Sequence, residues 1–354
     1  MADTTPDLPQ EIIELILSKL SLKSLLQFKT VSKSWNTLIS DPIFVKNHHQ
    51  QSKQSNSNDL FLHKKSWNSS DGFSLVRLED EKLRTQRVIA PPHGWEHVLC
   101  FCEGLLLIQQ YGSRRLALWN PSTGAEKSLW LPYNCFKSNF GLCRDPITDD
   151  FKVVIASWEH YMVYSFKNNS WKKRIKYECV EYYRTQYIPG VCVDGASYWL
   201  WLSQNATIIM YFDPRDDKFK ILQKTESVVV EGNEPVFVAE LRGRLCVYCN
   251  NGRDKETILI WTKGKGIDNN SWNKLMNVEN VTMPILWFEL KCFIGNKIVI
   301  RNAKDDRLVV YNPYEKKFEQ FEDKEVGEYG LVPYVESVFF PTQNTKLKRK
   351  RKDL

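Results

Sequence analysis

The sequence predicts a multidomain protein of the α+β class, with a small helical unit followed by an all-β propeller of six blades. Three observations carry this prediction. Apolar residues within 8–46 recur at three- and four-residue spacing, which is the period of amphipathic helices. From Asp59 onward, short runs rich in Trp, Tyr, Phe and Val alternate with Gly, Asn, Asp and Pro, a pattern typical of short strands and turns. Within that region a unit of 45–50 residues repeats.

The composition is that of a globular chain. Of its 354 residues 42% are hydrophobic, and 49 Lys and Arg stand against 42 Asp and Glu, for a formal charge of +7. No apolar run approaches the roughly 18 residues that span a bilayer, and the first ten residues lack the features of a signal peptide. We therefore expect a protein inside the cell. The nine cysteines, an odd number, are interpreted as thiols of a reducing compartment.

Residues 1–46 are predicted to form three helices. Asp7 can cap the first helix. Pro9 suits its first turn, because the amide proton that proline lacks has no hydrogen-bond partner there. Ser21 can cap the second, and Asp41-Pro42 marks a new start after the third. The first helix carries its apolar residues on one shared face: Ile12, Ile13, Ile16, Leu17 and Leu20. Such a small core is seldom stable alone, so exposed apolar surface and a partner are expected.

Two polar segments bound the β-rich domain, which is predicted over residues 59–341. Residues 47–58 contain no aliphatic residue and no Phe, Tyr or Trp, and are predicted to be a linker that cannot bury a face. Residues 342–354 form a basic tail. Its cationic side chains are Lys346, Lys348, Arg349, Lys350, Arg351 and Lys352.

Five copies of the repeat align on one aromatic position, occupied by Trp119, Tyr164, Phe212, Trp261 and Tyr311. A second aromatic follows seven residues later in three copies and after an insertion in the fourth, whereas the first copy has Glu126: Trp171, Phe219, Phe318 and Trp272. Each pair brackets a turn, which predicts a hairpin with an aromatic on both strands. Four strands per unit of this length indicate a β-propeller. A sixth blade is predicted from residues 60–62, 73–78 and 335–340, and would close the ring.

The stretch LPQEIIELILSKLSLKSLLQFKTVSKSWNTLI (residues 8–39) resembles the F-box, the module by which adaptor subunits dock onto the Skp-type protein of a cullin-based ubiquitin ligase. Its Leu8-Pro9 opening and its Ser32-Lys33-Ser34-Trp35 sequence match the motif, whereas Leu22 stands where many members have proline. The resemblance implies a Skp-binding surface formed or supported by Leu8, Pro9, Ile12, Ile16, Leu20, Leu25, Val31 and Trp35. The alternative is an ordinary amphipathic cap on the following domain.

The repeat resembles the kelch pattern, with one glycine per unit (Gly104, Gly195, Gly243 and Gly295) where kelch repeats carry a pair. The phrases WNPSTG, FGLCRDPITDDFKVV and VYSFKNNSWK resemble the F-box-associated domain of the large plant F-box family, across residues 59–340. Together the two resemblances imply a non-catalytic substrate-recognition adaptor of an SCF-type (Skp-cullin-F-box) ubiquitin ligase. It would bind the Skp-type adaptor, and through it cullin and RING subunits, and would present an unidentified target protein for ubiquitination and degradation.

Loops on one face of the propeller are expected to bind the target, because exposed aromatic residues supply much of the energy of interfaces. Core packing is the alternative for each. The candidates are Trp95, Trp158, His160, Tyr161, Tyr182, Tyr183, Tyr187 and Trp287.

The sequence contains no phosphate loop, dinucleotide fingerprint or nucleophile elbow. Cys246 and Cys249 have the spacing of a zinc half-site, but in a strand they would point to opposite faces. The local cluster His93, His97, Cys100 and Cys102 is interpreted as loop histidines and core thiols. The acidic pairs Asp149-Asp150 and Asp216-Asp217 are predicted to cap turns. We expect no enzymatic activity, no cofactor and no metal.

A competing class of function is a nuclear nucleic-acid-binding or scaffold protein that uses the basic tail and the propeller. Residues 346–354 hold six basic side chains and Asp353, and so contribute +5 of the +7, which leaves the rest of the chain nearly neutral. We therefore interpret the tail as a nuclear localisation signal and expect the protein in the cytoplasm and nucleus. Neither nucleic acid nor a membrane is expected as a partner.

Overall fold

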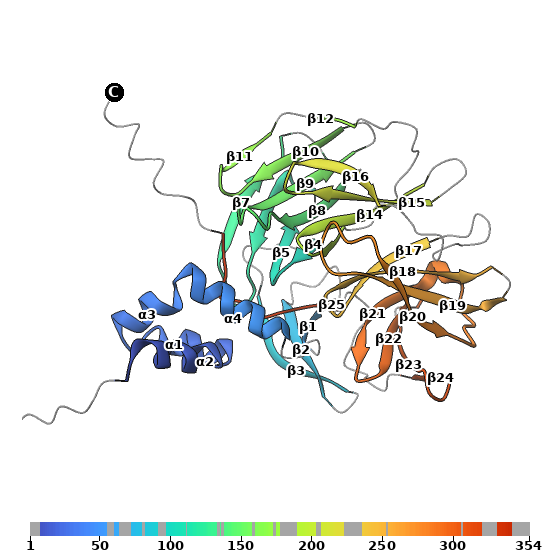
Figure 1. Cartoon of the computed structure of the whole chain (residues 1–354), viewed down its shortest axis with the longest axis horizontal. Coiled ribbons are helices and arrows are strands. Elements are labelled where there is room, and N and C mark those ends of the chain that lie inside the picture. Colours follow the sequence, from blue (N-terminus) through green and yellow to red (C-terminus); the bar gives the residue numbers. More distant parts are fainter. Residues whose placement is uncertain are drawn as a thin grey trace, which may run out of the picture.

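In its described residues, the computed structural model of the chain shows four α-helices beside a ring of six sheets (Figure 1), which confirms the predicted fold class. No helix in the described part of the chain is long and apolar enough to cross a membrane. The described residues are 8–54, 60–63, 72–79, 82–90, 97–110, 112–132, 135, 138–157, 160–172, 175–177, 190–202, 207–222, 236–252, 254–305, 307–320 and 331–341.

The helical unit consists of α1 (Gln10–Ser18), α2 (Leu22–Phe28), α3 (Lys33–Ile39) and α4 (Pro42–Gln54). Ser21 and Ser32 cap α2 and α3, because their hydroxyls accept hydrogen bonds from amide N–H groups of the first turn. Asp41 does the same for α4. The four helices meet on a small core of Leu17, Leu25, Ile39 and Phe44.

The prediction of a polar linker over residues 47–58 is wrong for 47–54, which continue α4. The helical period turns His48 and His49 toward the other helices, so that only 3% and 4% of their surfaces are exposed. The Nε2 atom of His48 donates a hydrogen bond to the carbonyl oxygen of Leu20 at 2.9 Å, and its ring stacks on Phe44. A helical segment without aliphatic residues can therefore still bury a face, because imidazole rings combine an apolar body with a polar edge.

Each blade is an antiparallel sheet with its first strand next to the centre of the ring. Blade 1 contains β4 (His97–Cys102), β5 (Leu105–Gln109), β6 (Arg115–Trp119) and β7 (Glu126–Trp130). Blade 2 contains β8 (Asn139–Arg144), β9 (Phe151–Ala156), β10 (His160–Ser165), β11 (Ser170–Trp171) and β12 (Ile175–Lys176). Blade 3 contains β13 (Val191–Val193), β14 (Ala196–Leu202), β15 (Thr207–Asp213) and β16 (Lys218–Leu222).

The remaining blades follow the same plan. Blade 4 contains β17 (Val236–Leu241), β18 (Arg244–Asn251), β19 (Asp254–Lys263) and β20 (Trp272–Val278). Blade 5 contains β21 (Phe288–Ile294), β22 (Lys297–Asn302), β23 (Arg307–Asn312) and β24 (Lys317–Gln320). Blade 6 joins the two ends of the domain and contains β25 (Leu331–Pro333), β1 (Leu60–His63), β2 (Phe73–Glu79) and β3 (Lys82–Ile89).

The aromatic repeat occupies equivalent places in the blades, on the third and fourth strands. Three of the pairs lie directly opposite each other across these strands, namely Tyr164 and Trp171, Phe212 and Phe219, and Tyr311 and Phe318. In blade 1 Trp119 lies opposite Glu126. In blade 4 the insertion shifts the pairing, so that Trp272 lies opposite Lys263.

Ring closure between the two ends is confirmed, but the terminal strand is β25, which pairs with β1, and not the predicted residues 335–340. Residues 334–341, which we call the C-terminal strap, cross blade 1 instead. The side-chain amide of Asn120 donates to the carbonyl oxygens of Ser337 and Phe339, at 2.8 and 2.7 Å. Phe339 stacks on Phe151 of blade 2. A β-carbon on Gly104, whose φ is +80°, would lie 2.5 Å from the carbonyl oxygen of Val335, so the strap also requires this glycine.

Because antiparallel strands alternate in direction, the propeller has two distinct faces. The turn face holds the turns between first and second strands and between third and fourth strands, together with the C-terminal strap. The loop face holds the connections from second to third strands and from each blade to the next. As the second strand of its blade, β1 begins on the turn face, so the helical unit joins the propeller from that side.

Candidate functional site

The helical unit exposes an unusual amount of apolar surface. Six of the thirteen large hydrophobic side chains that are exposed in the described residues lie within 8–54: Leu8, Ile12, Leu15, Ile16, Val31 and Ile43. Their exposed fractions range from 42% for Ile12 to 69% for Ile43. We call this set the docking surface, because exposed apolar surface at this density marks sites of protein association.

The apolar residues of α1, predicted to share one face, in fact divide between two. Ile13 and Leu20 pack against the helical core around Leu17, whereas Ile12 and Ile16 are 42% and 49% exposed. The apolar belt of α1 is wider than one core can cover, so one side of it supports the fold and the other is free for a partner.

The predicted Skp-binding residues divide in the same way. Leu8, Pro9, Ile12, Ile16 and Val31 are exposed, whereas Leu25 is fully buried and Leu20 and Trp35 are half-buried against the helical core. The first set can touch a partner, whereas Leu25 supports the helices from within the core.

Leu15 and Ile43 are exposed members of the docking surface that sequence reasoning missed. The signal for Leu15 was its position three residues after Ile12, on the same side of the helix. Ile43 lies two residues after the capping residue Asp41. The sequence marked Asp41-Pro42 only as the start of a helix and gave no sign that the Ile43 side chain would be exposed.

Most of the candidate target-binding residues lie outside the described residues: Trp95, Trp158, Tyr182, Tyr183 and Tyr187. For Tyr161 the prediction of an exposed contact is wrong, because 4% of its surface is exposed and its hydroxyl donates to the carbonyl oxygen of Asp217. It stays inside because it closes an aromatic cluster between blades 2 and 3. His160 is half-buried opposite Lys176, and Trp287 is half-buried at the end of the 3₁₀ helix η3 (Ile285–Trp287). The basic tail also lies outside the described residues.

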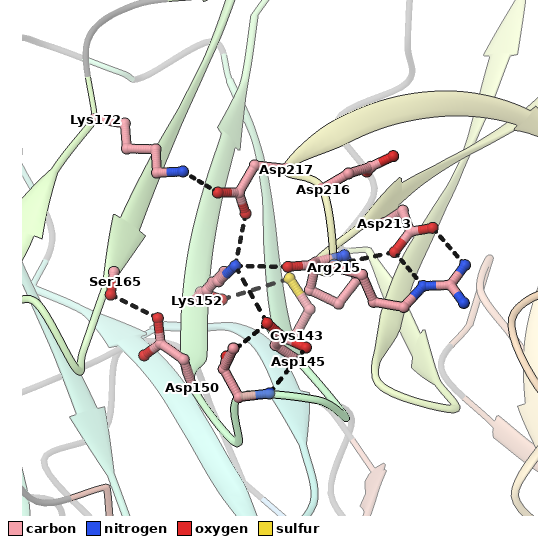
Figure 2. Close-up of polar contacts among 12 residues, drawn as sticks. Cys143, Asp145, Asp150, Lys152, Ser165, Lys172, Asp213, Arg215, Asp216 and Asp217 are labelled. Atoms are coloured by element: carbon pink, nitrogen blue, oxygen red, sulfur yellow. Dashed lines mark hydrogen bonds and ion pairs between the residues drawn. The ribbon is translucent and has the colours of Figure 1, made fainter.

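A cluster of carboxylates on the turn face joins blades 2 and 3 (Figure 2). The Nζ atom of Lys152 donates to the carbonyl oxygen of Pro214 at 2.5 Å and to Asp217 at 2.7 Å, and Lys172 also pairs with Asp217. Asp150 accepts from Ser165 and from a turn amide, as a turn-capping carboxylate should. The cluster therefore works as a clamp between blades, and the described residues contain no group of three or more side chains able to hold a metal ion.

Asp213, on the opposite side of blade 3, gives the clearest dependence of stability on pH. Its carboxylate is fully buried, with Arg215 and Lys220 each 2.7 Å from Oδ2. Burial alone would raise its pKa, but hydrogen bonds from Arg215 and Lys220 lower the pKa to about 2. Since an unfolded aspartate titrates at about 3.9, this stabilisation is present above pH 4 and is lost as the pH falls toward 2.

Replacing Asp213 with Asn is expected to lower the free energy of unfolding at pH 7 by about 2 kcal/mol. It should also flatten the loss of stability between about pH 4 and pH 2, as measured by urea unfolding. Asp268→Asn is the matched control, because Asp268 pairs with the same Arg215 but is 75% exposed, and screened ion pairs contribute little. Equal losses in the two variants would contradict the assignment.

The cysteines are core thiols as expected. Cys246 and Cys249 are both buried on β18 and pack on its opposite sides, in two different core clusters. Cys100 and Cys102 lie in the core of blades 1 and 2, and burial raises the pKa of the Cys100 thiol. None of the eight cysteines in the described residues forms a disulfide. His93 and the side chain of His97 lie outside the described residues.

Comparison with known families decides the affiliation. Residues 6–47 match the F-box domain, and residues 81–339 match the F-box associated beta propeller domain. The chain belongs to the F-box-associated β-propeller family. Both resemblances seen in the sequence are thereby confirmed. The docking surface falls inside the F-box match, and F-box domains bind Skp-type adaptors in SCF complexes.

Relatives in Arabidopsis thaliana align with most of the chain. F-box/LRR-repeat/kelch-repeat protein At1g09650 is 25% identical over 319 residues, covering 79% of each chain. F-box/kelch-repeat protein At3g23880 is 24% identical over 343 residues, covering 88% of this chain and 89% of that one. Among solved structures, a chain of a nidogen/laminin complex aligns with a TM-score of 0.46 and 11% identity, covering 78% of this chain and 98% of that chain. The family is one of adaptor-type proteins, generally without catalytic activity.

Proposed function

We propose that this F-box protein is the substrate receptor of an SCF-type ubiquitin ligase. The part of the docking surface on α1 carries the proposal, because Ile12 and Ile16 stay exposed although Leu17 of the same helix is buried. A Skp-type protein would cover this surface and connect the chain to cullin and RING subunits. A target protein would bind the loop face of the propeller, which is opposite the face that the helical unit joins.

The mechanism that follows is positioning. A receptor that holds the target and the Skp-type protein at once makes ubiquitin transfer effectively intramolecular, and raises the local concentration of target lysines near the charged conjugating enzyme. The helix α4 favours this role, because it packs against α1 and α3 and continues to Gln54, close to the first strand of the propeller. The chemistry of transfer belongs to other subunits, so the chain itself needs no catalytic group.

The proposal is tested with the full chain in cells under proteasome inhibition. Proximity labelling with the wild-type chain and with the double variant Ile12→Asp, Ile16→Asp should mark the same target proteins, because the propeller is untouched. Ubiquitin conjugates on those targets should appear only with the wild-type chain. Equal ubiquitination of the labelled proteins with both chains would overturn the proposal.

We also propose that the basic tail directs the protein to the nucleus, in addition to the cytoplasm. The proposal is supported by the charge, since residues 346–354 carry +5 of the total +7, a cluster typical of nuclear localisation signals. Deleting residues 346–352 from a fluorescent fusion should remove the nuclear signal. A deletion variant that remained nuclear would contradict the assignment.

A further inference from the structure

One corner of the loop face combines exposed apolar side chains with a cation. It is formed by η3, just before β21, and by the turn between β22 and β23. Leu286 is 60% exposed and Trp287 is half-buried. The Nζ atom of Lys304 lies 4.8 Å from the centre of the Trp287 ring. We call these three residues the blade 5 corner.

The backbone holds the blade 5 corner in one arrangement. The amide of Trp287 donates to the carbonyl oxygen of Pro284 at 2.9 Å, which closes the 3₁₀ turn, and the carbonyl of Trp287 accepts from Ala303 at 2.7 Å. The amide of Lys304 donates to Asn302 Oδ1 at 3.1 Å. Below the corner, Ile285 and Phe288 are buried in the core between blades 4 and 5. A surface fixed in this way loses little conformational freedom when a partner binds.

The cations in and around the blade 5 corner differ in whether they form an ion pair with a described residue. Arg301 and Lys291 both pair with Glu289, and Arg307 pairs with Asp305. Lys304 forms no ion pair with any residue that the structure describes; its ammonium group rests on the Trp287 ring. An ammonium has three N–H donors, so a carboxylate can approach Lys304 while the ring remains in contact with it.

Two other cations that lie over aromatic rings have polar partners within the chain. Arg144 lies over Phe151 and Phe339 but pairs with Glu103 and Asp149. Arg242 lies over Phe293 but donates to the carbonyl oxygen of Gly295. Lys127 lies over Tyr164 and Phe166 without a hydrogen-bond partner in the described residues, but its Nζ atom is buried. Lys304 differs from Lys127 because it is exposed, so its ammonium group can meet an external partner.

We propose that the blade 5 corner binds a target segment in which an apolar side chain stands next to an Asp or Glu. This inference rests on the proposed function and names the class of target segment. The apolar side chain would pack on Leu286 and on the open part of the Trp287 ring, since aromatic anchors carry much of the energy of an interface. The carboxylate would accept charge-assisted hydrogen bonds from Lys304, which are stronger than neutral ones.

The test uses the full chain, purified with its Skp-type protein and exposed to a random library of displayed 12-residue peptides. Peptides selected by the wild-type chain should be enriched in Asp or Glu beside an aliphatic or aromatic residue. Lys304→Glu should weaken binding of the selected peptides at least tenfold and shift a new selection toward Lys and Arg. Trp287→Ala should remove the apolar preference.

Lys265→Glu is the matched control, because Lys265 is exposed on the turn face and the substitution changes the net charge by the same amount. It should select the same peptides as the wild-type chain. Absence of acidic-apolar enrichment in the wild-type selection, or an unchanged selection with Lys304→Glu, would overturn the inference. Co-purification with the Skp-type protein separates the two proposals, because Lys304→Glu should leave that binding intact. Failure of the wild-type chain to bind the Skp-type protein would instead count against the proposed function.

Discussion

The double variant Ile12→Asp, Ile16→Asp is expected to bind a Skp-type protein roughly 1,000-fold more weakly than the wild-type chain. Burying the exposed half of one isoleucine contributes about 1 kcal/mol, and desolvating an unpaired carboxylate in its place costs at least about 1 kcal/mol more. The two positions together lose about 4 kcal/mol, and 1.4 kcal/mol corresponds to a factor of ten in affinity. Both side chains are about half exposed in the free chain, so the variant should keep its circular dichroism spectrum and its unfolding midpoint. Binding is measured by titration of the purified chain with the purified Skp-type protein.

The chain offers a matched control for this experiment. Ile147 and Ile221 are also exposed, at 76% and 41%, but lie on the propeller. The double variant Ile147→Asp, Ile221→Asp makes the same chemical change away from the docking surface and should bind the Skp-type protein as the wild-type chain does. Equal affinities for the two double variants would refute the docking surface. Leu25→Ala is unsuitable for this purpose, because Leu25 is fully buried and its loss would unfold the helical unit.

Asn120→Ala is expected to lower the free energy of unfolding by about 4 kcal/mol, since each buried polar group left without a partner costs about 1–3 kcal/mol. The side chain of Asn120 is fully buried. The variant would leave the carbonyl oxygens of Ser337 and Phe339 without their donor, and the amides of Ser122 and Thr123 without their acceptor. Urea unfolding monitored by tryptophan fluorescence measures the loss.

Asn312 provides the comparison that isolates the strap. It occupies the equivalent Asn-Pro turn of blade 5, where its Oδ1 accepts from the amides of Tyr314 and Glu315. Asn312→Ala therefore removes the same turn contacts without touching the C-terminal strap, and should cost about 1–2 kcal/mol. The difference between the two variants measures what the strap contributes. If both lost the same stability, the strap would have no part in holding the ring closed.

The sequence predicted the parts of the fold that repeat or follow a regular period. The aromatic at Tyr164, Phe212 and Tyr311 marks the third strand of a blade because one structural unit recurs, and its partner seven residues later lies opposite across a short turn. The division of α1 between core and docking surface was beyond the same reasoning. Ile12 and Ile13 are chemically alike, and only the position of the other helices decides which of them is covered.

The errors in α4 and in the strap share one physical cause. Both segments are held by contacts between residues far apart in sequence, such as His48 with Leu20 and Asn120 with Ser337. Local composition described residues 47–54 as polar and residues 335–340 as strand-forming, and both descriptions are correct for an isolated segment. Tertiary contacts then determined the structure that formed.

The pairing of β25 with β1 has a consequence for the synthesis of the protein. A ribosome releases the helical unit and β1 to β3 first, but these three strands lack the innermost strand of their blade until residues 331–333 emerge. A nascent or prematurely terminated chain could thus carry a folded helical unit next to an open ring with an unpaired strand edge, a feature that promotes aggregation. The ring closes only after residues 331–333 have been translated. The complete loop face therefore forms only in a chain that extends at least to β25.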